Sequence, residues 1–251
     1  MSKWFFAGIS LLLSTFAGAT DIPAVLQWAQ RVELAAPVSG VVQTVDVEVG
    51  RRVKKGQVLL SLDARGYRAK VAESQALVVK FQGEAAEAKR NLVRVQELYD
   101  RTVIATTELD QAKLRHTTAQ AQLDEARARA EQERKNLNDS VLRAPFDAVV
   151  VARLAEPGQA VASGLQPQPL LVLAKADEML ARLKLYDTQL GGLKPGQAVT
   201  VEVGRQSYPG KIKTLGLEPV SVKDGVVYQV DVAFPVSGVL RAGTPAIVKL
   251  P

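Results

Sequence analysis

A short sequence pattern occurs twice in this chain, with the two copies 108 residues apart. The matching pairs are Ala36-Pro37 and Ala144-Pro145, Val41-Val42 and Val149-Val150, Gly50 and Gly158, Val53 and Val161, and Gly56 and Gly164. Each copy combines β-branched residues with turn glycines, which predicts short strands. About 30 residues are too few to bury a sheet face alone, since isolated hairpins are marginally stable. We therefore expect the copies to pair with each other in one split β-sandwich.

The segment between the copies, 64–140, has a different composition. It contains no proline and is rich in Ala, Gln, Glu, Arg and Lys. Two series of residues in it step by alternating threes and fours, which is the repeat of a coiled coil. The first is Tyr67, Val71, Ser74, Val78, Phe81, Ala85, Ala88, Leu92, Val95 and Tyr99, and the second is Leu109, Ala112, His116, Ala119, Leu123, Ala126, Ala130, Glu133 and Leu137. We predict helices over 64–100 and 108–139 that pair as an antiparallel hairpin.

Capping residues and a β-branched stretch bound these two helices. Asp63 can cap the first helix, and Thr107 followed by Asp110 is a weak relative of the capping box that would open the second. The segment 102–106 is β-branched and poor in helix formers, so the chain should turn there. Because both outer ends are anchored in one β-domain, the hairpin should project as a rod about 50 Å long.

The C-terminal part predicts separate strands with Gly/Pro turns. The expected strands are Met179–Tyr186, Ala198–Val203, Lys211–Leu215, Val226–Phe234 and Ala246–Leu250. Several short strands at regular spacing favour a small β-barrel, to which the segment before Pro37 should add a further strand. The fold class is therefore mixed α and β: a split lipoyl/biotinyl-like β-sandwich with an inserted antiparallel α-helical coiled-coil hairpin, followed by a small β-barrel.

The N-terminus has the features of an export signal. Lys3 precedes the apolar stretch 4–16, and Ala17-Gly18-Ala19 supplies a small-x-small cleavage site, so the mature chain should begin at Thr20. An uncleaved anchor is the alternative, but the stretch is shorter than the roughly 20 apolar residues of a membrane span. The expected organisation is a signal peptide over 1–19, the first barrel strand with the first sandwich half over 20–63, the hairpin over 64–140, the second half over 141–174 and the barrel over 175–251.

Composition argues against several classes of function. The net charge of +6 comes from interleaved Lys/Arg and Asp/Glu, which indicates a solvated surface and not a nucleic-acid site. With no Cys and one His, His116, neither a disulfide nor a soft-metal site is expected. Lipoyl and biotinyl carriers present a modifiable Lys on the turn between the two halves, where this chain carries its hairpin. We therefore expect no cofactor and no enzymatic activity.

The order and spacing of the motifs carry a family resemblance. The motifs are Ala36-Pro37-x-x-Gly40, Gly50-x-x-Val53-x-x-Gly56, Leu142-Arg143-Ala144-Pro145, Glu156-Pro157-Gly158-x-x-Val161, Leu193-x-Pro195-Gly196-Gln197 and Leu240-Arg241-x-Gly243. Together they resemble the membrane fusion proteins, the periplasmic adaptor subunits of tripartite efflux pumps, with the resistance-nodulation-division type first among them. The resemblance covers nearly all of the chain after the signal.

This resemblance implies a periplasmic, homo-oligomeric adaptor that bridges an inner-membrane transporter and an outer-membrane channel and supports the export of small molecules. It would be held at the inner membrane by its transporter. Two alternatives remain: an adaptor of an ATP-driven exporter or type I secretion system, and an envelope spacer without a transport role. Many members carry a further membrane-proximal domain, and we expect none in this chain. The barrel around 185–193 and 208–217 should then contact the transporter.

The resemblance also implies a docking site at the hairpin tip. Adaptors that meet outer-membrane channels commonly carry Arg-Leu-x-x-Leu followed by Gly, Ser and Asp at set spacing. The equivalent positions here are Arg94, Val95, Leu98, Thr102, Ala105 and Asp110. In this site Arg94 would pair with polar groups of a partner's helical tip and Leu98 would fill a groove, while Ala105 lacks a hydroxyl that could hydrogen-bond. The alternative is that Arg94 and Asp110 are ordinary solvated helix charges.

Overall fold

The computed structural model describes residues 20–164, 168–222 and 225–250. The predicted signal peptide over 1–19 lies outside the described residues. The chain divides into two compact units, one formed by Arg31–Ala174 and the other by the segments on either side of it. Within the described ranges, no helix combines the length and apolar character needed to span a bilayer.

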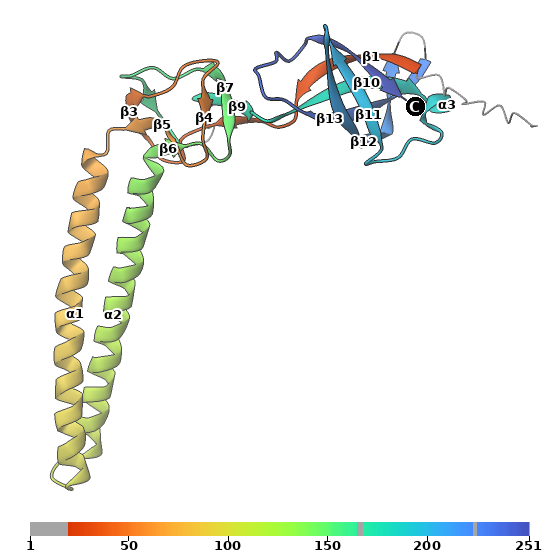
Figure 1. Ribbon diagram of the computed structural model, residues 1–251. Helices are drawn as coiled ribbons and strands as arrows, with labels where there is room; N and C mark the ends of the chain where they lie inside the picture. The colour runs from red at the N-terminus through yellow and green to blue at the C-terminus, as the bar shows by residue number, and fades with distance from the viewer. Residues whose placement is uncertain (1–19, 165–167, 223–224, 251) are drawn as a thin grey trace, which may run out of the picture. The chain divides into compact units, whose positions relative to one another are not determined.

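The first unit contains a sandwich of two four-stranded sheets (Figure 1). One sheet has the order β2 (Arg31–Leu34), β9 (Leu171–Lys175), β7 (Ala148–Arg153) and β4 (Arg52–Val53); the other has β6 (Val141–Arg143), β5 (Val58–Leu62), β3 (Gly40–Val45) and β8 (Ala160–Val161). Each sheet combines strands from both sequence copies. The prediction that the copies pair in one split sandwich is confirmed.

The two copies hold each other by reciprocal contacts. Gly40 lies opposite Val161 in the pair β3–β8, and Val53 lies opposite Ala148 in the pair β4–β7. A side chain of each copy also binds the backbone of the other copy. Ser39 Oγ accepts a hydrogen bond from the Ser163 N–H, and Asp147 Oδ1 accepts one from the Lys55 N–H. This second bond is the main reason why the pKa of Asp147 is lowered. The internal repeat thus produces a pseudo-twofold domain.

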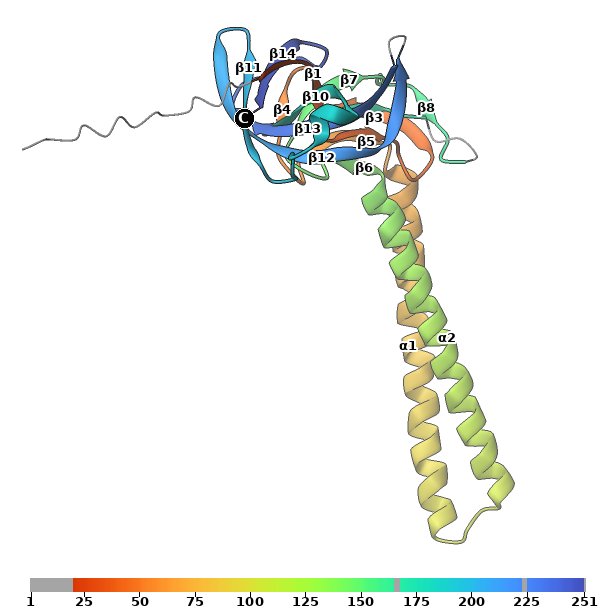
Figure 2. The ribbon, with the colours of Figure 1, turned by 90° about the vertical axis from the view of Figure 1, so that its right-hand side faces the viewer.

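The inserted segment forms two long antiparallel helices, α1 (Arg65–Asp100) and α2 (Thr106–Asp139) (Figures 1 and 2). No residue of either predicted coiled-coil series is exposed, so the predicted seam is confirmed position by position. The fully buried members are Ser74, Val78, Ala85, Leu109, Ala112, Leu123 and Ala126.

The helix starts differ slightly from the prediction. Helix α1 begins at Arg65 and not at residue 64. The prediction that Asp63 caps it is wrong, because the N-cap residue is Ala64 and makes no side-chain cap bond, although Asp63 accepts a hydrogen bond from the Arg65 N–H at 3.0 Å. Helix α2 begins at Thr106 and not at residue 108. The predicted capping box of Thr107 and Asp110 is wrong, because the N-cap residue is Ala105 and no side chain caps this helix.

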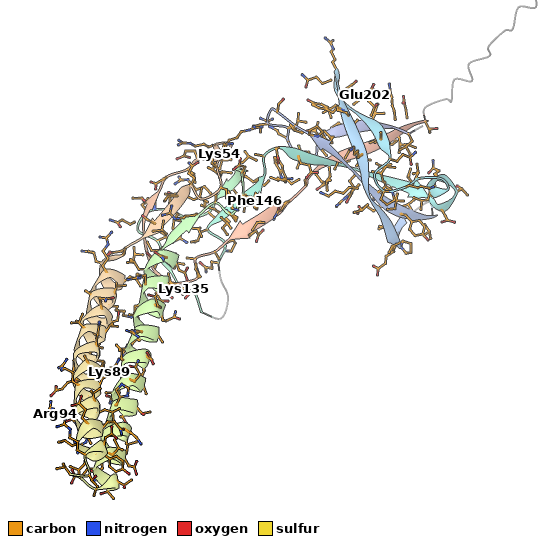
Figure 3. The ribbon with its side chains drawn as sticks, turned by 60° about the horizontal axis from the view of Figure 1, so that its bottom comes forward. Lys54, Lys89, Arg94, Lys135, Phe146 and Glu202 are labelled. Atoms are coloured by element: carbon orange, nitrogen blue, oxygen red, sulfur yellow. The ribbon has the colours of Figure 1, made fainter. Side chains whose placement is uncertain are left out.

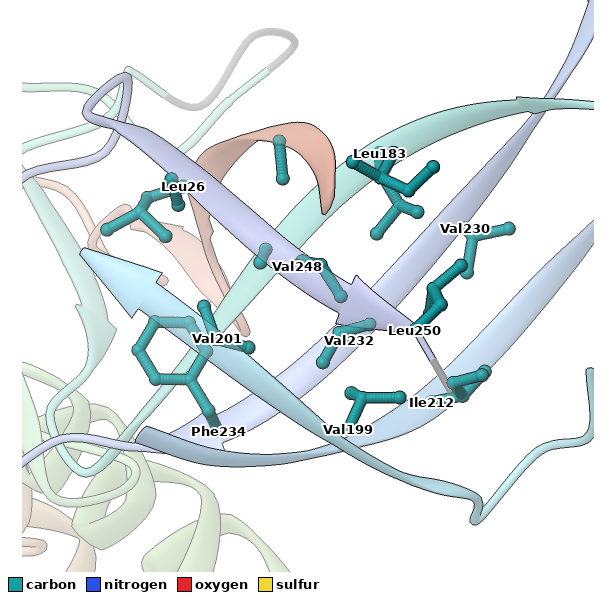
Figure 4. Packing of buried hydrophobic residues seen from close by; sticks show 14 of the residues in the cluster. Leu26, Leu183, Val199, Val201, Ile212, Val230, Val232, Phe234, Val248 and Leu250 are labelled. Atoms are coloured by element: carbon teal, nitrogen blue, oxygen red, sulfur yellow. The ribbon is translucent and has the colours of Figure 1, made fainter. Parts of the chain in front are cut away.

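The second unit is a closed six-stranded barrel. Its strand order is β1 (Thr20–Trp28), β10 (Glu178–Tyr186), β13 (Gly225–Pro235), β12 (Gln206–Val222), β11 (Ala198–Val203) and β14 (Pro245–Leu250), with a short helix α3 (Asp187–Leu190) after β10. The expected strand from the N-terminal segment is β1. Figure 4 shows the apolar core, in which Leu26, Leu183 and Phe234 are almost fully buried.

Strand β12 is longer than predicted. The predicted strand covers Lys211–Leu215, although Pro and Gly are usually unfavourable within a strand, as Pro209 and Gly210 would be just before it. The structure begins the strand at Gln206 and pairs Pro209 with Thr200 of β11. Gly210 is accommodated because neighbouring strands approach closely there: a Cβ at this position would lie 2.8 Å from Val232 Cγ1. Two register shifts follow, which let this long strand bend.

Candidate functional site

The sandwich fixes the base of the hairpin on both helices. The Leu62 N–H donates to the Ser140 carbonyl and the Asp63 N–H donates to the Val41 carbonyl, both at 2.8 Å. The Tyr67 hydroxyl donates to the Ser39 carbonyl. These bonds join the first turn of α1 and the end of α2 to the β-strands, so the direction of the hairpin is set by the sandwich.

Asp63 adds a charged contact at the base. Its carboxylate accepts hydrogen bonds from the guanidinium and the backbone N–H of Arg65, and these bonds lower the pKa of Asp63 to about 2. A carboxylate at the start of a helix also interacts favourably with the helix dipole. This local contact orients the carboxylate at the start of α1.

The seam between the helices is narrow. Its buried cluster consists of Val78, Ala85, Leu123 and Ala126, against which Phe81, Ala119 and Ala130 pack. His116 is half-buried in this seam, as expected from its place in the second series. Because the seam uses a single stripe of each helix, the other faces remain available to solvent or to partners.

At the distal end, α1 is closed by a Schellman motif. The Thr102 N–H donates to the Tyr99 carbonyl at 2.8 Å, and the Val103 N–H donates to the Leu98 carbonyl at 3.1 Å. These are the two bonds that define the motif, and it requires a left-handed residue between the helix and the turn. Thr102 has that conformation, with φ of 60°. The family pattern has Gly at this position, and the geometry gives a physical reason for it.

Ala105 is the N-cap of α2 and has the extended backbone of such a residue, with φ of −77° and ψ of 153°. Ser at an N-cap accepts a hydrogen bond from an N–H of the first helical turn, which Ala cannot do. The family pattern has Ser here. A hydroxyl at this position would therefore stabilise the start of α2. This role explains Ser in the family pattern as well as a hydrogen bond to the partner does.

The six predicted docking residues occupy the distal part of the hairpin but differ in exposure. Arg94 lies on the outer surface (Figure 3) and makes no hydrogen bond or ion pair with any described residue. Val95 is part of the seam and half-buried. Leu98 is 36% exposed, and Thr102 and Ala105 are exposed in the turn. Asp110 is exposed, and its Oδ1 lies 3.8 Å from Lys113 Nζ.

Sequence reasoning missed two apolar side chains of the tip region. Val103 is 65% exposed in the turn, directly after Thr102, and Leu114 is 67% exposed on α2. Both were visible as large apolar residues outside the two coiled-coil series, a signal that the prediction did not use. With Leu98 they give the distal hairpin an apolar character that its seam does not need.

The barrel carries a second set of exposed apolar residues. Leu217 is 93% exposed, and Tyr186, Val220 and Val226 are also exposed. Tyr186 and Val220 both lie opposite Val227 in the sheet, so they share one face of it. Within the described ranges, no group of three or more acidic or His side chains is placed to hold a metal ion.

Comparison with known families and relatives gives a consistent picture. Residues 30–166 match the family described as CzcB-like, barrel-sandwich hybrid domain. The Macrolide export protein MacA of Yersinia pestis is 27% identical over 221 residues, which cover 81% of this chain and 59% of that protein. The chain thus spans about three fifths of the length of this curated relative.

Two solved structures have a similar fold. The membrane fusion protein Spr0693 from Streptococcus pneumoniae R6 is 14% identical, with a TM-score of 0.72 over 92% of this chain and 98% of that one. A MacA-MexA chimera that contains the Pseudomonas aeruginosa MexA α-hairpin domain is 22% identical, with a TM-score of 0.67 over 92% of this chain and 80% of that one. At these identities the likeness establishes the fold.

Proposed function

This chain belongs to the membrane fusion proteins with a CzcB-like barrel-sandwich hybrid domain, and from this premise we propose that it is a periplasmic efflux adaptor that docks an outer-membrane channel with its hairpin tip and an inner-membrane transporter with its barrel. One observation carries the proposal. The hairpin extends from the sandwich and ends in the exposed apolar residues Leu98 and Val103, close to Arg94, which makes no hydrogen bond or ion pair with the part of the chain that the structure describes. With 36 residues in α1, the tip lies about 50 Å from the base.

The chemistry of the tip favours a protein partner. Exposed apolar side chains gain free energy when a partner removes them from water, at about 25 cal/mol per Å². Arginine is enriched in protein interfaces because its planar guanidinium binds carboxylates and carbonyls in fixed geometry. A helical channel tip with an apolar groove and acidic or carbonyl groups at its rim would satisfy both kinds of group.

The barrel is the proposed contact for the transporter. The exposed residues Tyr186 and Leu217 fall within the two predicted segments, 185–193 and 208–217, and Val220 lies directly beyond the second. An apolar surface of this kind on a small barrel is typical of a binding face. We propose no catalytic step for the chain, and the transporter would supply the energy whether it uses protons or ATP.

We also propose a homo-oligomer. Val79 and Val93 are exposed on the shaft of α1, outside the seam. They are two heptads apart, so they lie on the same side of the helix. A neighbouring hairpin could cover this side, which would arrange several copies around a common axis between the two membranes.

Site-directed cross-linking in intact cells tests the docking proposal. The chain contains no Cys, so a single introduced Cys gives an unambiguous probe. Leu98→Cys at the tip should capture an outer-membrane protein through a thiol cross-linker. Ala128→Cys is the matched control, because this exposed shaft residue lies on α2 and not on the side of α1 that Val79 and Val93 form. If Leu98→Cys captures no channel, or if both variants capture it equally, the tip is not the docking site.

A further inference from the structure

Thr102 is the only non-glycine residue with a positive φ among the residues that the structure describes. The left-handed region costs an ordinary L-residue energy because Cβ approaches the following carbonyl oxygen. For a β-branched residue such as Thr this backbone is a rare outlier. The position is in the turn of the hairpin, where the chain must reverse between α1 and α2.

The same conformation places two apolar residues at paired positions of the motif. Leu98 and Val103 occupy the C3 and C″ positions of the Schellman motif, and the side chains at these positions frequently pack against each other. Both keep a large exposed fraction, 36% and 65%. When Thr102 leaves the left-handed region, the bond from the Val103 N–H to the Leu98 carbonyl is lost, and the motif no longer fixes the distance between these two residues.

Nothing on the α2 side compensates for the cost at Thr102. The N-cap residue Ala105 offers no side-chain acceptor to the first turn of α2. We call the tip closed when Thr102 is in the left-handed region and both bonds of the Schellman motif are formed. Thr102 disfavours this form at the end of α1, and no side-chain cap stabilises it at the start of α2. Such a turn should open locally far more often than the rest of the hairpin.

We propose that Thr102 is a positioning residue that sets the strength of docking: its backbone holds Leu98 and Val103 together as one apolar projection, and its unfavourable side chain keeps the closed tip only partly populated. This rests on the proposed function, since the projection is the part that enters the groove of the channel. A partner that binds only the closed tip has its apparent affinity reduced by the fraction of tips that are open.

Two substitutions at Thr102 distinguish a role of its backbone geometry from a direct contact of its side chain with the channel. If the Thr102 hydroxyl touches the channel, its removal by Thr102→Val or Thr102→Gly must weaken docking in both variants. If Thr102 acts through backbone geometry, Thr102→Gly must strengthen docking, because Gly occupies the left-handed region without cost. Thr102→Val keeps the β-branched shape and should then leave docking unchanged.

Hydrogen exchange on the free full-length chain is the first measurement. In Thr102→Gly the Val103 amide should exchange about five- to thirty-fold more slowly than in the wild type, which corresponds to the usual cost of the left-handed region. Thr102→Val should exchange at the wild-type rate. Gly83→Ala is the control for general stiffening of the hairpin, because Gly83 lies in the middle of α1 with open space around it. Its Val103 amide should not change.

Binding to the purified channel captured from the Leu98→Cys cross-link is the second measurement. Thr102→Gly should bind the channel at least about twofold more tightly than the wild type does. The gain in affinity should not exceed the factor by which this substitution slows exchange of the Val103 amide. Gly83→Ala and Thr102→Val should bind as the wild type does. The proposal is overturned if Thr102→Gly fails to bind more tightly, or if Gly83→Ala gains as much. If the wild-type chain binds no channel, the proposed function fails, and the exchange experiment alone decides whether Thr102 holds the tip.

Discussion

The base and the tip of the hairpin close the same two helices in opposite ways. At the base, the Tyr67 side chain and the backbone groups of Asp63 and Ser140 bind partners that lie far away in the sequence, while the Asp63 carboxylate binds the nearby Arg65. At the tip, the turn relies on backbone bonds alone, with Thr102 in a conformation that its side chain disfavours and Ala105 unable to cap. Contacts between distant parts of the sequence thus stabilise the base, whereas the turn at the tip exposes apolar groups and is closed by local backbone bonds.

The largest contrast should appear when the same substitution is made at the two ends. Leu60 is fully buried in the sandwich, and Leu60→Ala should lower the free energy of unfolding by about 2–5 kcal/mol because it leaves a cavity. Leu98→Ala at the tip should change it by no more than about 0.5 kcal/mol, as is usual for exposed residues. Urea unfolding followed by circular dichroism measures both. The two variants should rank in the opposite order when each is combined with Val103→Cys and cross-linked to the channel. Only Leu98→Ala should then lose the cross-linked product. Equal stability losses would mean that the tip is as tightly packed as the base.

A smaller effect is expected from one hydroxyl at the base. Tyr67→Phe removes the donor to the Ser39 carbonyl and should destabilise the unit by about 1 kcal/mol, the usual net value of such a bond. Tyr99→Phe is the matched control near the tip, because the Tyr99 hydroxyl makes no hydrogen bond with a described residue. Thermal melts of both variants should shift only for Tyr67→Phe. A similar shift in both would show that the ring environment, and not the bond, matters.

The tip should respond to an added cap. Ala105→Ser supplies the missing acceptor and should stabilise the hairpin by about 0.5 kcal/mol, the lower end of the range for N-caps, because the site is exposed. Ala121→Ser is the control inside α2, also at an exposed position, where Ser should destabilise because it is a poorer helix former than Ala. The measurement is the urea midpoint at constant slope. If both variants shift in the same direction, Ala105 does not behave as an N-cap.

Sequence patterns predicted the parts of the molecule that repeat. The seam was predictable down to small residues such as Ser74 and Ala112, because a 3.5-residue period places them on one side of a helix whatever their size. The split sandwich was predictable because its two halves share one spacing. The contact between Tyr67 and Ser39 was not, since it depends on where two separate elements meet in space.

The tip positions were identified from the family pattern, but their physical roles were not. Nothing in the sequence around Thr102 indicates a left-handed backbone, since the residue type argues against it and only the closure of α1 imposes it. The exposed side chain of Val103 was not predicted as part of the docking site, because its β-branched character was taken only to indicate the end of the helix. The early start of β12 was missed for a related reason: Pro209 and Gly210 are unfavourable locally, and the packing of the barrel overrides that preference.

The smallest expected effect is the part of the pH dependence of stability that Asp63 contributes at the base. The hydrogen bonds from Arg65 hold the pKa of Asp63 at about 2, against 3.8 for the free side chain. A carboxyl with a lowered pKa in the folded state contributes stability that is complete above its unfolded pKa and is lost as the pH falls through its folded pKa. The loss should therefore fall between about pH 4 and pH 2.

Asp63→Asn tests this pH dependence while it keeps an acceptor for the Arg65 N–H. The melting temperatures of the variant and the wild type should differ at pH 6 and converge toward pH 2, because protonated Asp63 resembles Asn. Asp63→Ala removes the acceptor as well, so it should remain less stable than the wild type at both pH values. A constant difference between Asp63→Asn and the wild type over this range would mean that the charge of Asp63 does not hold the base, and the contrast between the two ends would then rest on Tyr67 and the backbone bonds.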